Sequence, residues 1–163
     1  MIPMKIEYYH ASKYGNGVVV AEEFKKIMST KGAIVNIHHI RDVKPKEFAQ
    51  ADLYVFSSPG RIGKPIRGMR RFLKKVQIPS GTKYAILTTQ GAPRPNKKTG
   101  QMPTDEEQAK WQRITPIMME LLEPKGLQKV AEGKILVTGI KGPLEDDWQK
   151  KVEEFAARIQ MTT

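Results

Sequence analysis

The sequence predicts an α/β domain in which a five-stranded parallel sheet carries helices on both faces. Five short apolar runs rich in β-forming residues alternate with segments of helical periodicity, and this alternation is typical of parallel strands joined by right-handed crossovers. The chain has 163 residues, 39% of them hydrophobic, with no shift of composition along its length. This length gives room for one complete core, so we expect residues 1–163 to form a single domain.

The expected strands are apolar runs bounded by turn residues. They cover Met4–Tyr9, Ala33–His38, Asp52–Ser57, Tyr84–Thr89 and Gly133–Thr138. The first expected helix runs from about Gly17 to Lys31, because apolar residues recur there at helical spacing and Gly32 follows as a stop signal. Its predicted buried side chains are Val18, Ala21, Phe24, Ile27 and Met28.

The next two crossovers differ in length. Residues 43–50 are expected to hold only a turn or two of helix beginning near Pro45, whereas a full helix is expected from Pro65 or Ile66 to Lys75. A fourth helix opens with Thr104-Asp105-Glu106-Glu107, a capping box. Its predicted buried stripe is Ala109, Ile114, Ile117, Met118, Leu121 and Leu122, with a kink or early break at Pro116. The last helix is expected to start at Pro143 or Leu144 and to bury Leu144, Trp148, Val152, Phe155 and Ile159.

Composition excludes several classes of chemistry. The chain has no cysteine, which rules out disulfides, thiolate catalysis, iron–sulfur clusters and Cys-ligated zinc. No apolar run reaches membrane-spanning length, and Met1-Ile2-Pro3-Met4 leads into the first strand without a signal-like segment. We therefore expect a cytoplasmic protein without membrane insertion, and we predict neither a metal site nor catalytic side chains.

In such folds ligands lie beyond the carboxyl ends of the strands. The loops after the first, third and fourth strands, Ser12–Gly17, Ser57–Lys64 and Thr88–Pro103, are all rich in Gly, Ser, Thr or Pro. The first of them joins a strand to a helix, so its N–H groups and the helix N-terminus converge on one point. This arrangement indicates a phosphate-binding loop.

These loops resemble those of the flavodoxin-like family. Residues 9–17, followed by an amphipathic helix, are similar to the FMN phosphate loop of the family, and residues 57–65 and Thr88-Thr89-Gln90-Gly91 resemble its two further flavin loops. The resemblance implies a flavodoxin-like three-layer sandwich that binds FMN. The implied cofactor-binding residues are Ser12, Lys13, Tyr14, Gly15, Asn16, Gly17, Ser58, Pro59, Gly60, Arg61, Ile62, Gly63, Thr89, Gln90 and Gly91.

The sequence departs from the family pattern in two respects. Gly17 stands where flavodoxins usually have threonine, so one hydroxyl contact is missing, at a cost of about 1 kcal/mol. The stretches Ser58–Pro65 and Gly91–Pro103 contain no aromatic residue to flank the flavin. The ring would then rest on Ile62, Met102 or prolines, while Trp111 is expected to face the surface or a partner more readily than the flavin.

The histidines do not indicate a metal site. His38 and His39 are adjacent in an expected strand, which sends them to opposite faces of the sheet. His10 lies beside the phosphate loop and is a candidate for orienting it.

The net charge of +11 favours anionic partners. Arg61, Lys64, Arg94, Lys97 and Lys98 are expected to border the flavin. A cation near 6 Å would stabilise a reduced, anionic flavin by on the order of 3 kcal/mol at an effective dielectric near 20, or on the order of 0.1 V. We therefore expect a less negative final reduction potential than in typical flavodoxins, and docking to acidic redox proteins.

Three functions stay open. A diffusible FMN electron carrier, monomeric or weakly dimeric, fits the resemblance best. An FMN-dependent quinone or NAD(P)H reductase or dehydrogenase is the alternative, because an aromatic-poor ring site leaves space for a substrate. A flavin-free basic binding module is the third, although nucleic acid is disfavoured because the basic stretch lacks interleaved aromatic residues.

Overall fold

The computed structural model describes residues 2–44, 46–139 and 141–161. Its central sheet has the strand order β2-β1-β3-β5-β6, and all neighbours in it are parallel. The strands are β1 (Lys5–His10), β2 (Ile34–His39), β3 (Leu53–Arg61), β5 (Lys83–Gly91) and β6 (Gln128–Val137). The five-stranded parallel sheet predicted from the sequence is therefore present.

A sixth strand was not predicted. The two-residue strand β4 (Lys64–Pro65) pairs antiparallel with the end of β3, Gly60 opposite Pro65 and Arg61 opposite Lys64. It lies outside the parallel path and turns the second predicted flavin loop into a tight hairpin. The apolar pattern gave no signal for it because the strand is too short for any periodicity.

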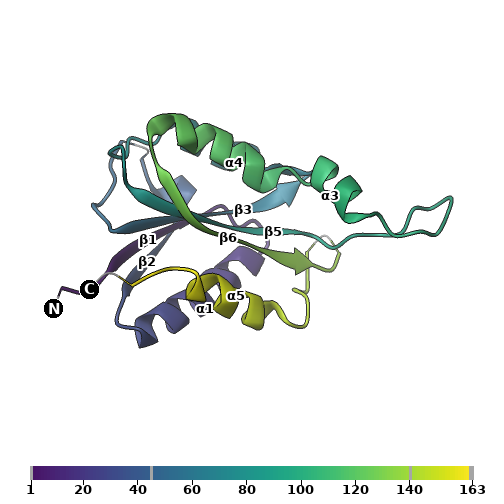
Figure 1. The fold of residues 1–163 in the computed structure, drawn as a ribbon, viewed down its shortest axis with the longest axis horizontal. Coiled ribbons are helices and arrows are strands. Elements are labelled where there is room, and N and C mark those ends of the chain that lie inside the picture. The colour runs from purple at the N-terminus through teal and green to yellow at the C-terminus, as the bar shows by residue number, and fades with distance from the viewer. Residues whose placement is uncertain (1, 45, 140, 162–163) are drawn as a thin grey trace.

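Helices cover both faces of the sheet (Figure 1). On one face α1 (Asn16–Thr30) and α5 (Trp148–Ala157) share a core with β1, which includes Tyr8, Phe24 and Phe155. On the other face α2 (Arg67–Lys75) and α4 (Ile114–Leu122) share a core with Tyr9, Phe56 and Tyr84. Phe24 and Phe155, which were predicted to be buried on helices, are core residues, whereas Trp148 is half-buried. Two 3-10 turns, Ile40–Asp42 and Glu123–Lys125, precede β3 and β6.

The predicted fourth helix is two helices, α3 (Asp105–Trp111) and α4. The capping box is present, with the Thr104 hydroxyl accepting from Glu107 N–H at 3.2 Å. The chain breaks at Gln112 and Arg113, before Pro116, which lies in the first turn of α4 where a missing N–H costs nothing. Ala109 is exposed rather than buried because α3 packs no face into the core.

Other boundaries also differ from the prediction. The last helix starts at Trp148, because Leu144 instead forms a β-bridge with Val137. Val18 is 40% exposed, and Val20 takes the inward position on α1. The turn expected within residues 43–50 is not helical in its described part, and its predicted start, Pro45, lies outside the described residues.

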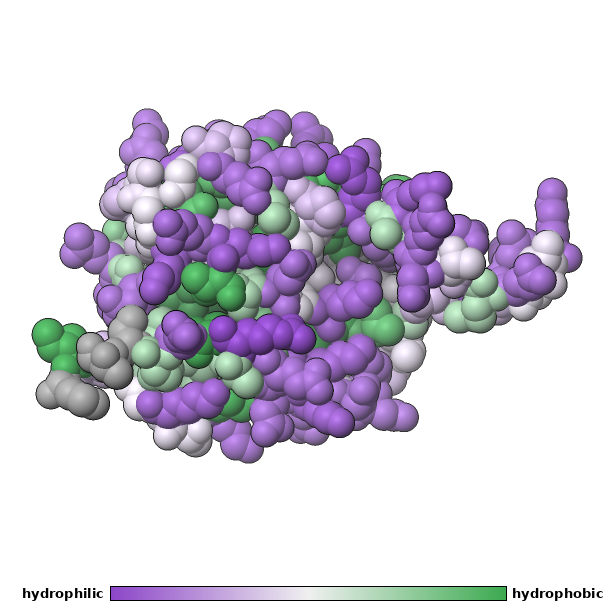
Figure 2. All heavy atoms as spheres, viewed as in Figure 1, coloured by the Kyte–Doolittle hydropathy of each residue, from purple (hydrophilic) through white to green (hydrophobic). Residues whose placement is uncertain are grey.

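The connection between β5 and α3 extends away from the body of the molecule (Figure 1). Asn96 organises its tip: its N–H donates to Gln101 O and its carbonyl accepts from Gly100 N–H, both at 2.8 Å, while its side chain accepts from Lys98 N–H. Hydrophilic residues predominate over this segment in Figure 2. In the part of the chain that the structure describes, no helix is both long and apolar enough to span a membrane.

Candidate ligand-binding cleft at the carboxyl ends of the strands

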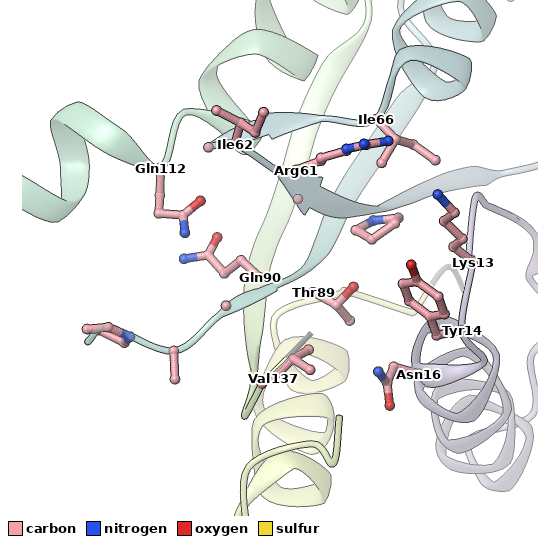
Figure 3. A pocket seen from close by; sticks show the side chains of 18 of the residues that line it. Lys13, Tyr14, Asn16, Arg61, Ile62, Ile66, Thr89, Gln90, Gln112 and Val137 are labelled. Atoms are coloured by element: carbon pink, nitrogen blue, oxygen red, sulfur yellow. The ribbon is translucent and has the colours of Figure 1, made fainter. Parts of the chain in front are cut away.

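A cleft of about 640 Å³ opens where β1, β3, β5 and β6 end. All three predicted flavin loops line it, and the α3–α4 junction closes a further side (Figure 3). The lining consists of Ser12–Tyr14, Asn16, Gly17, Pro59–Gly63, Ile66, Thr89–Arg94, Gln108, Trp111, Gln112, Val137 and Gly139. Its volume lies within the usual range for small-molecule sites.

The first loop has the geometry of an anion site. Gly15 adopts a left-handed conformation, with φ 94°, and immediately precedes α1. Among the described residues, the N–H groups of 13, 14, 16, 17 and 18 donate no hydrogen bond, and the first turn of α1 contains no acidic residue. Five free donors at a helix N-terminus attract a negative group such as a phosphate.

Two histidines fix Ser12 within this loop. Ser12 N–H donates to His10 Nδ1 at 3.1 Å, and His39 Nε2 donates to the Ser12 carbonyl at 3.1 Å. His39 Nδ1 in turn accepts from Arg41 N–H at 3.2 Å. In these contacts Nδ1 of each ring is the acceptor. Burial, followed by the nearby His39 and Arg41, lowers the pKa of His10 to about 4, so this ring remains an acceptor at neutral pH.

Gly17 is required by close packing against Ser12. A Cβ at position 17 would lie 2.9 Å from Ser12 Cβ and 3.2 Å from its Oγ. The Ser12 hydroxyl also accepts from Gly15 N–H at 3.1 Å. The position of Ser12 therefore leaves no room for a threonine at position 17, and a larger residue there would displace the Ser12 hydroxyl.

The second loop is strained at its tip. Ile62 and Gly63 form the two-residue turn between β3 and β4, with φ values of 53° and 72°. A β-branched residue rarely adopts positive φ, yet Ile62 is 72% exposed and lines the cleft. The α3–α4 junction holds Gly63 in place, because Arg113 N–H donates to the Gly63 carbonyl at 2.7 Å. Only glycine fits at this position, since a Cβ would collide with the Trp111 carbonyl.

The α3–α4 junction adds side chains that the sequence did not assign to the site. Trp111 is 56% exposed and lines the cleft, so an aromatic ring missing from the loops comes from this junction. Gln112 and Gln90 point toward one another across the opening (Figure 3). Gln112 Oε1 is buried and has no hydrogen-bond partner among the described residues.

The charge of the cleft has one sign. Among the described residues, Lys13, Arg61 and Arg94 line it and no acidic residue does. Of the other cations expected at its border, Lys64, Lys97 and Lys98 are outside the lining. Lys13 Nζ lies 5.8 Å from the centre of the Tyr14 ring, and Lys141 Nζ lies 5.6 Å from it.

Thirteen of the fifteen predicted site residues line this one cleft, and Gly15 and Ser58 do not. Gly15 shapes the loop through its backbone, and the Ser58 hydroxyl donates to Pro59 O at 2.9 Å. Met102, a predicted ring contact, is 56% exposed and outside the lining. The lining residues that were not among the predicted cofactor-binding residues, apart from Arg94, are Ile66, Ala92, Pro93, Gln108, Trp111, Gln112, Val137 and Gly139. Gln108 and Gln112 have a helical spacing of four, but nothing in the sequence shows which way α3 faces.

The described residues include no group of three or more His, Asp or Glu side chains that could hold a metal ion. His38 lies on the opposite face of the sheet from His39, as expected, and contacts a carboxylate. Its Nε2 lies 3.0 Å from Glu7 Oε2.

Comparison with known proteins places this architecture in a class. No protein-family model matches the chain, and no curated protein matches it significantly. A flavodoxin from the domain Archaea is 18% identical with a TM-score of 0.69 over 94% of both chains. Oxidised flavodoxin 2 from Bacillus cereus is also 18% identical, with a TM-score of 0.69 over 94% of this chain and 96% of that one. The rubredoxin oxygen:oxidoreductase of Desulfovibrio gigas, 12% identical, matches with a TM-score of 0.65 over 35% of its own length.

The molecule is therefore a doubly wound α/β sandwich with a cleft at the carboxyl ends of its strands. More narrowly, it has the flavodoxin-like fold, as the sequence predicted.

Proposed function

We propose that the chain binds FMN in this cleft and acts as an electron-transfer protein. The observation that carries the proposal is the row of free N–H groups at residues 13, 14 and 16–18, which surround an αL glycine at the start of a helix. Such donors bind a phosphate dianion strongly, because hydrogen bonds to a charged acceptor exceed neutral ones.

The remaining lining residues fit the other parts of FMN. The cleft beyond the phosphate loop has Ile62 and Trp111 as apolar contacts for a ring. Gln90 and Gln112 also line the cleft and carry side-chain amides of the kind that hydrogen-bond the polar edge of a ring. Bound FMN supplies one- and two-electron redox chemistry. The chain's own residues hold the phosphate, shield the ring partly from water and provide positive charge beside it.

The test compares FMN with its phosphate-free analogue, riboflavin. Purified protein is incubated with each flavin, desalted and examined by visible absorption. Retention of FMN but not of riboflavin is expected, because the five N–H groups act on the phosphate. Retention of neither flavin would overturn the proposal, and salt-sensitive DNA binding by that flavin-free protein would favour the basic binding module.

We also propose acidic redox proteins as partners, as the sequence led us to expect. The segment between β5 and α3 supports this, because it carries Arg94, Lys97 and Lys98 and no acid between residues 92 and 104. It starts at the cleft, where Arg94 is a lining residue. Electron-transfer rates with an acidic carrier are expected to fall as ionic strength rises. A rate independent of salt would contradict this partner class.

The same preparation distinguishes an enzyme from a carrier. Steady oxidation of NAD(P)H in the presence of a quinone would favour the FMN-dependent reductase. Oxidation of at most one NAD(P)H per bound flavin would favour the carrier. The cytoplasmic location and the monomeric or weakly dimeric state remain predictions from the sequence.

A further inference from the structure

We propose that a second site, at the opposite end of the strands from the cleft, binds an oligophosphate. A hollow of about 680 Å³ lies there. Its lining includes Lys44, Lys46, Lys74, Lys75, Lys125 and one acid, Glu47. We call this group the lysine hollow, and it is independent of the FMN proposal.

The topology brings three segments that are distant in the sequence together at this end of the sheet. Lys44, Lys46 and Glu47 precede β3, Lys74 and Lys75 end α2 before β5, and Lys125 precedes β6. Each segment thus lies where a parallel strand begins, whereas the cleft lies where the strands end. A ligand in the hollow would contact lysines from all three segments.

The lysines of the hollow are poorly neutralised. Five lysines and one glutamate give a local charge of +4, out of +11 for the whole chain. Among the described residues, none of the six takes part in an ion pair. Like charges gathered on one concave surface repel each other, and an anion with several charges would relieve that repulsion.

Capping of α2 does not account for the cluster. Cations at a helix C-terminus stabilise its exposed carbonyls, and Lys125 Nζ does so by donating to Lys74 O at 3.0 Å. Val76 N–H donates to Phe72 O at 3.0 Å, which satisfies a second carbonyl. Lys44, Lys46, Lys74 and Lys75 make no such bond among the described residues, so their ammonium groups remain available.

The chemistry of the lining favours a chain of phosphates. Lysine ammonium groups bind phosphates as point charges, and cations spread over three segments match several phosphates better than one. The described residues of the lining include no aromatic side chain on which a base could stack. Inorganic polyphosphate and the triphosphate of a nucleotide share this chemistry.

The test measures binding of tripolyphosphate to the full chain by calorimetry at near-physiological salt, in the presence of excess FMN. The informative variant is K74Q/K75Q. The matched control is K25Q/K26Q, which removes an equally exposed adjacent pair from α1 on the other face of the sheet. We expect the first variant to weaken binding at least tenfold and the control to change it less than threefold.

Equal losses in both variants would overturn the proposal, because they would reflect net charge alone, and so would failure of the unaltered protein to bind. Circular dichroism of both variants checks that the fold is kept. ATP distinguishes the sources: affinity equal to that of tripolyphosphate supports recognition of the phosphates only, and tighter binding of ATP supports a nucleotide as the ligand.

Discussion

Ile62 carries an unusual backbone conformation at the mouth of the cleft. It is the one non-glycine residue with positive φ in the described part of the chain. Such a conformation costs on the order of 1–3 kcal/mol and is often retained at functional sites. The position is optimal for Asn, because a two-residue hairpin turn with positive φ at both residues favours Asn-Gly.

The substitution Ile62→Asn is expected to stabilise the protein and weaken FMN binding. Relief of strain should raise the free energy of unfolding by about 1 kcal/mol, or Tm by roughly 2–4 °C for a chain of this size. Loss of the apolar contact should weaken FMN severalfold. Calorimetry and flavin titration measure the two effects.

Ile34→Asn serves as the control, because Ile34 is 49% exposed on β2 and has ordinary strand geometry. It should not stabilise the protein. A variant at position 62 that is less stable but binds FMN as before would contradict a role of Ile62 in ligand contact.

His10 makes stability depend on pH. Its pKa is about 4 in the folded protein because of burial, below the ordinary value near 6.5. Between these values the unfolded chain binds a proton that the folded protein does not, so stability is fully present above pH 6.5 and is lost as pH falls towards 4. The variant His10→Gln keeps an acceptor for Ser12 N–H but does not titrate.

Urea unfolding at pH 7 and pH 5 measures this effect. The loss of stability between the two pH values should be smaller in His10→Gln by on the order of 1 kcal/mol. Other titrating groups contribute equally to both proteins. An identical pH dependence in the variant would show that His10 does not bind Ser12 in its neutral form.

At the scale of elements, the sequence predicts best where burial is extensive. The helix at 17–31 was predicted to within one residue at each end because its one buried face imposes a regular period. The strand at Met4–Tyr9 was predicted equally closely because nearly all of its residues are buried and a turn follows it. The strand β6 extends five residues before its predicted start at Gly133. Exposed polar residues such as Gln128 and Glu132 alternate there with less exposed ones and interrupt the apolar run.

The three loops could be predicted to form one site because the carboxyl ends of parallel strands lie at the same end of the sheet, which follows from topology alone. The contribution of α3 could not be predicted in this way. Trp111 and Gln112 reach the cleft because the chain breaks at Arg113 and because Arg113 N–H bonds to Gly63 O. That contact spans fifty residues, and no local pattern encodes it.

At the scale of the whole molecule, the positive charge has a consequence for the redox potential. The cleft is lined by Lys13, Arg61 and Arg94 and by no acid, so the anionic, fully reduced form of bound FMN should be stabilised. Arg61 and Arg94 are exposed, and solvent screening reduces the effect of each to tens of millivolts.

The double variant R61Q/R94Q should therefore lower the final midpoint potential of the bound flavin by several tens of millivolts. R67Q/R71Q is the matched control, because both arginines are exposed on α2 and neither lines the cleft. Spectroelectrochemical titration at low and high salt measures both variants. If the two pairs shift the potential equally, overall charge rather than the cleft sets it; if the shift is confined to Arg61 and Arg94 and shrinks with salt, the lining of the cleft tunes the flavin.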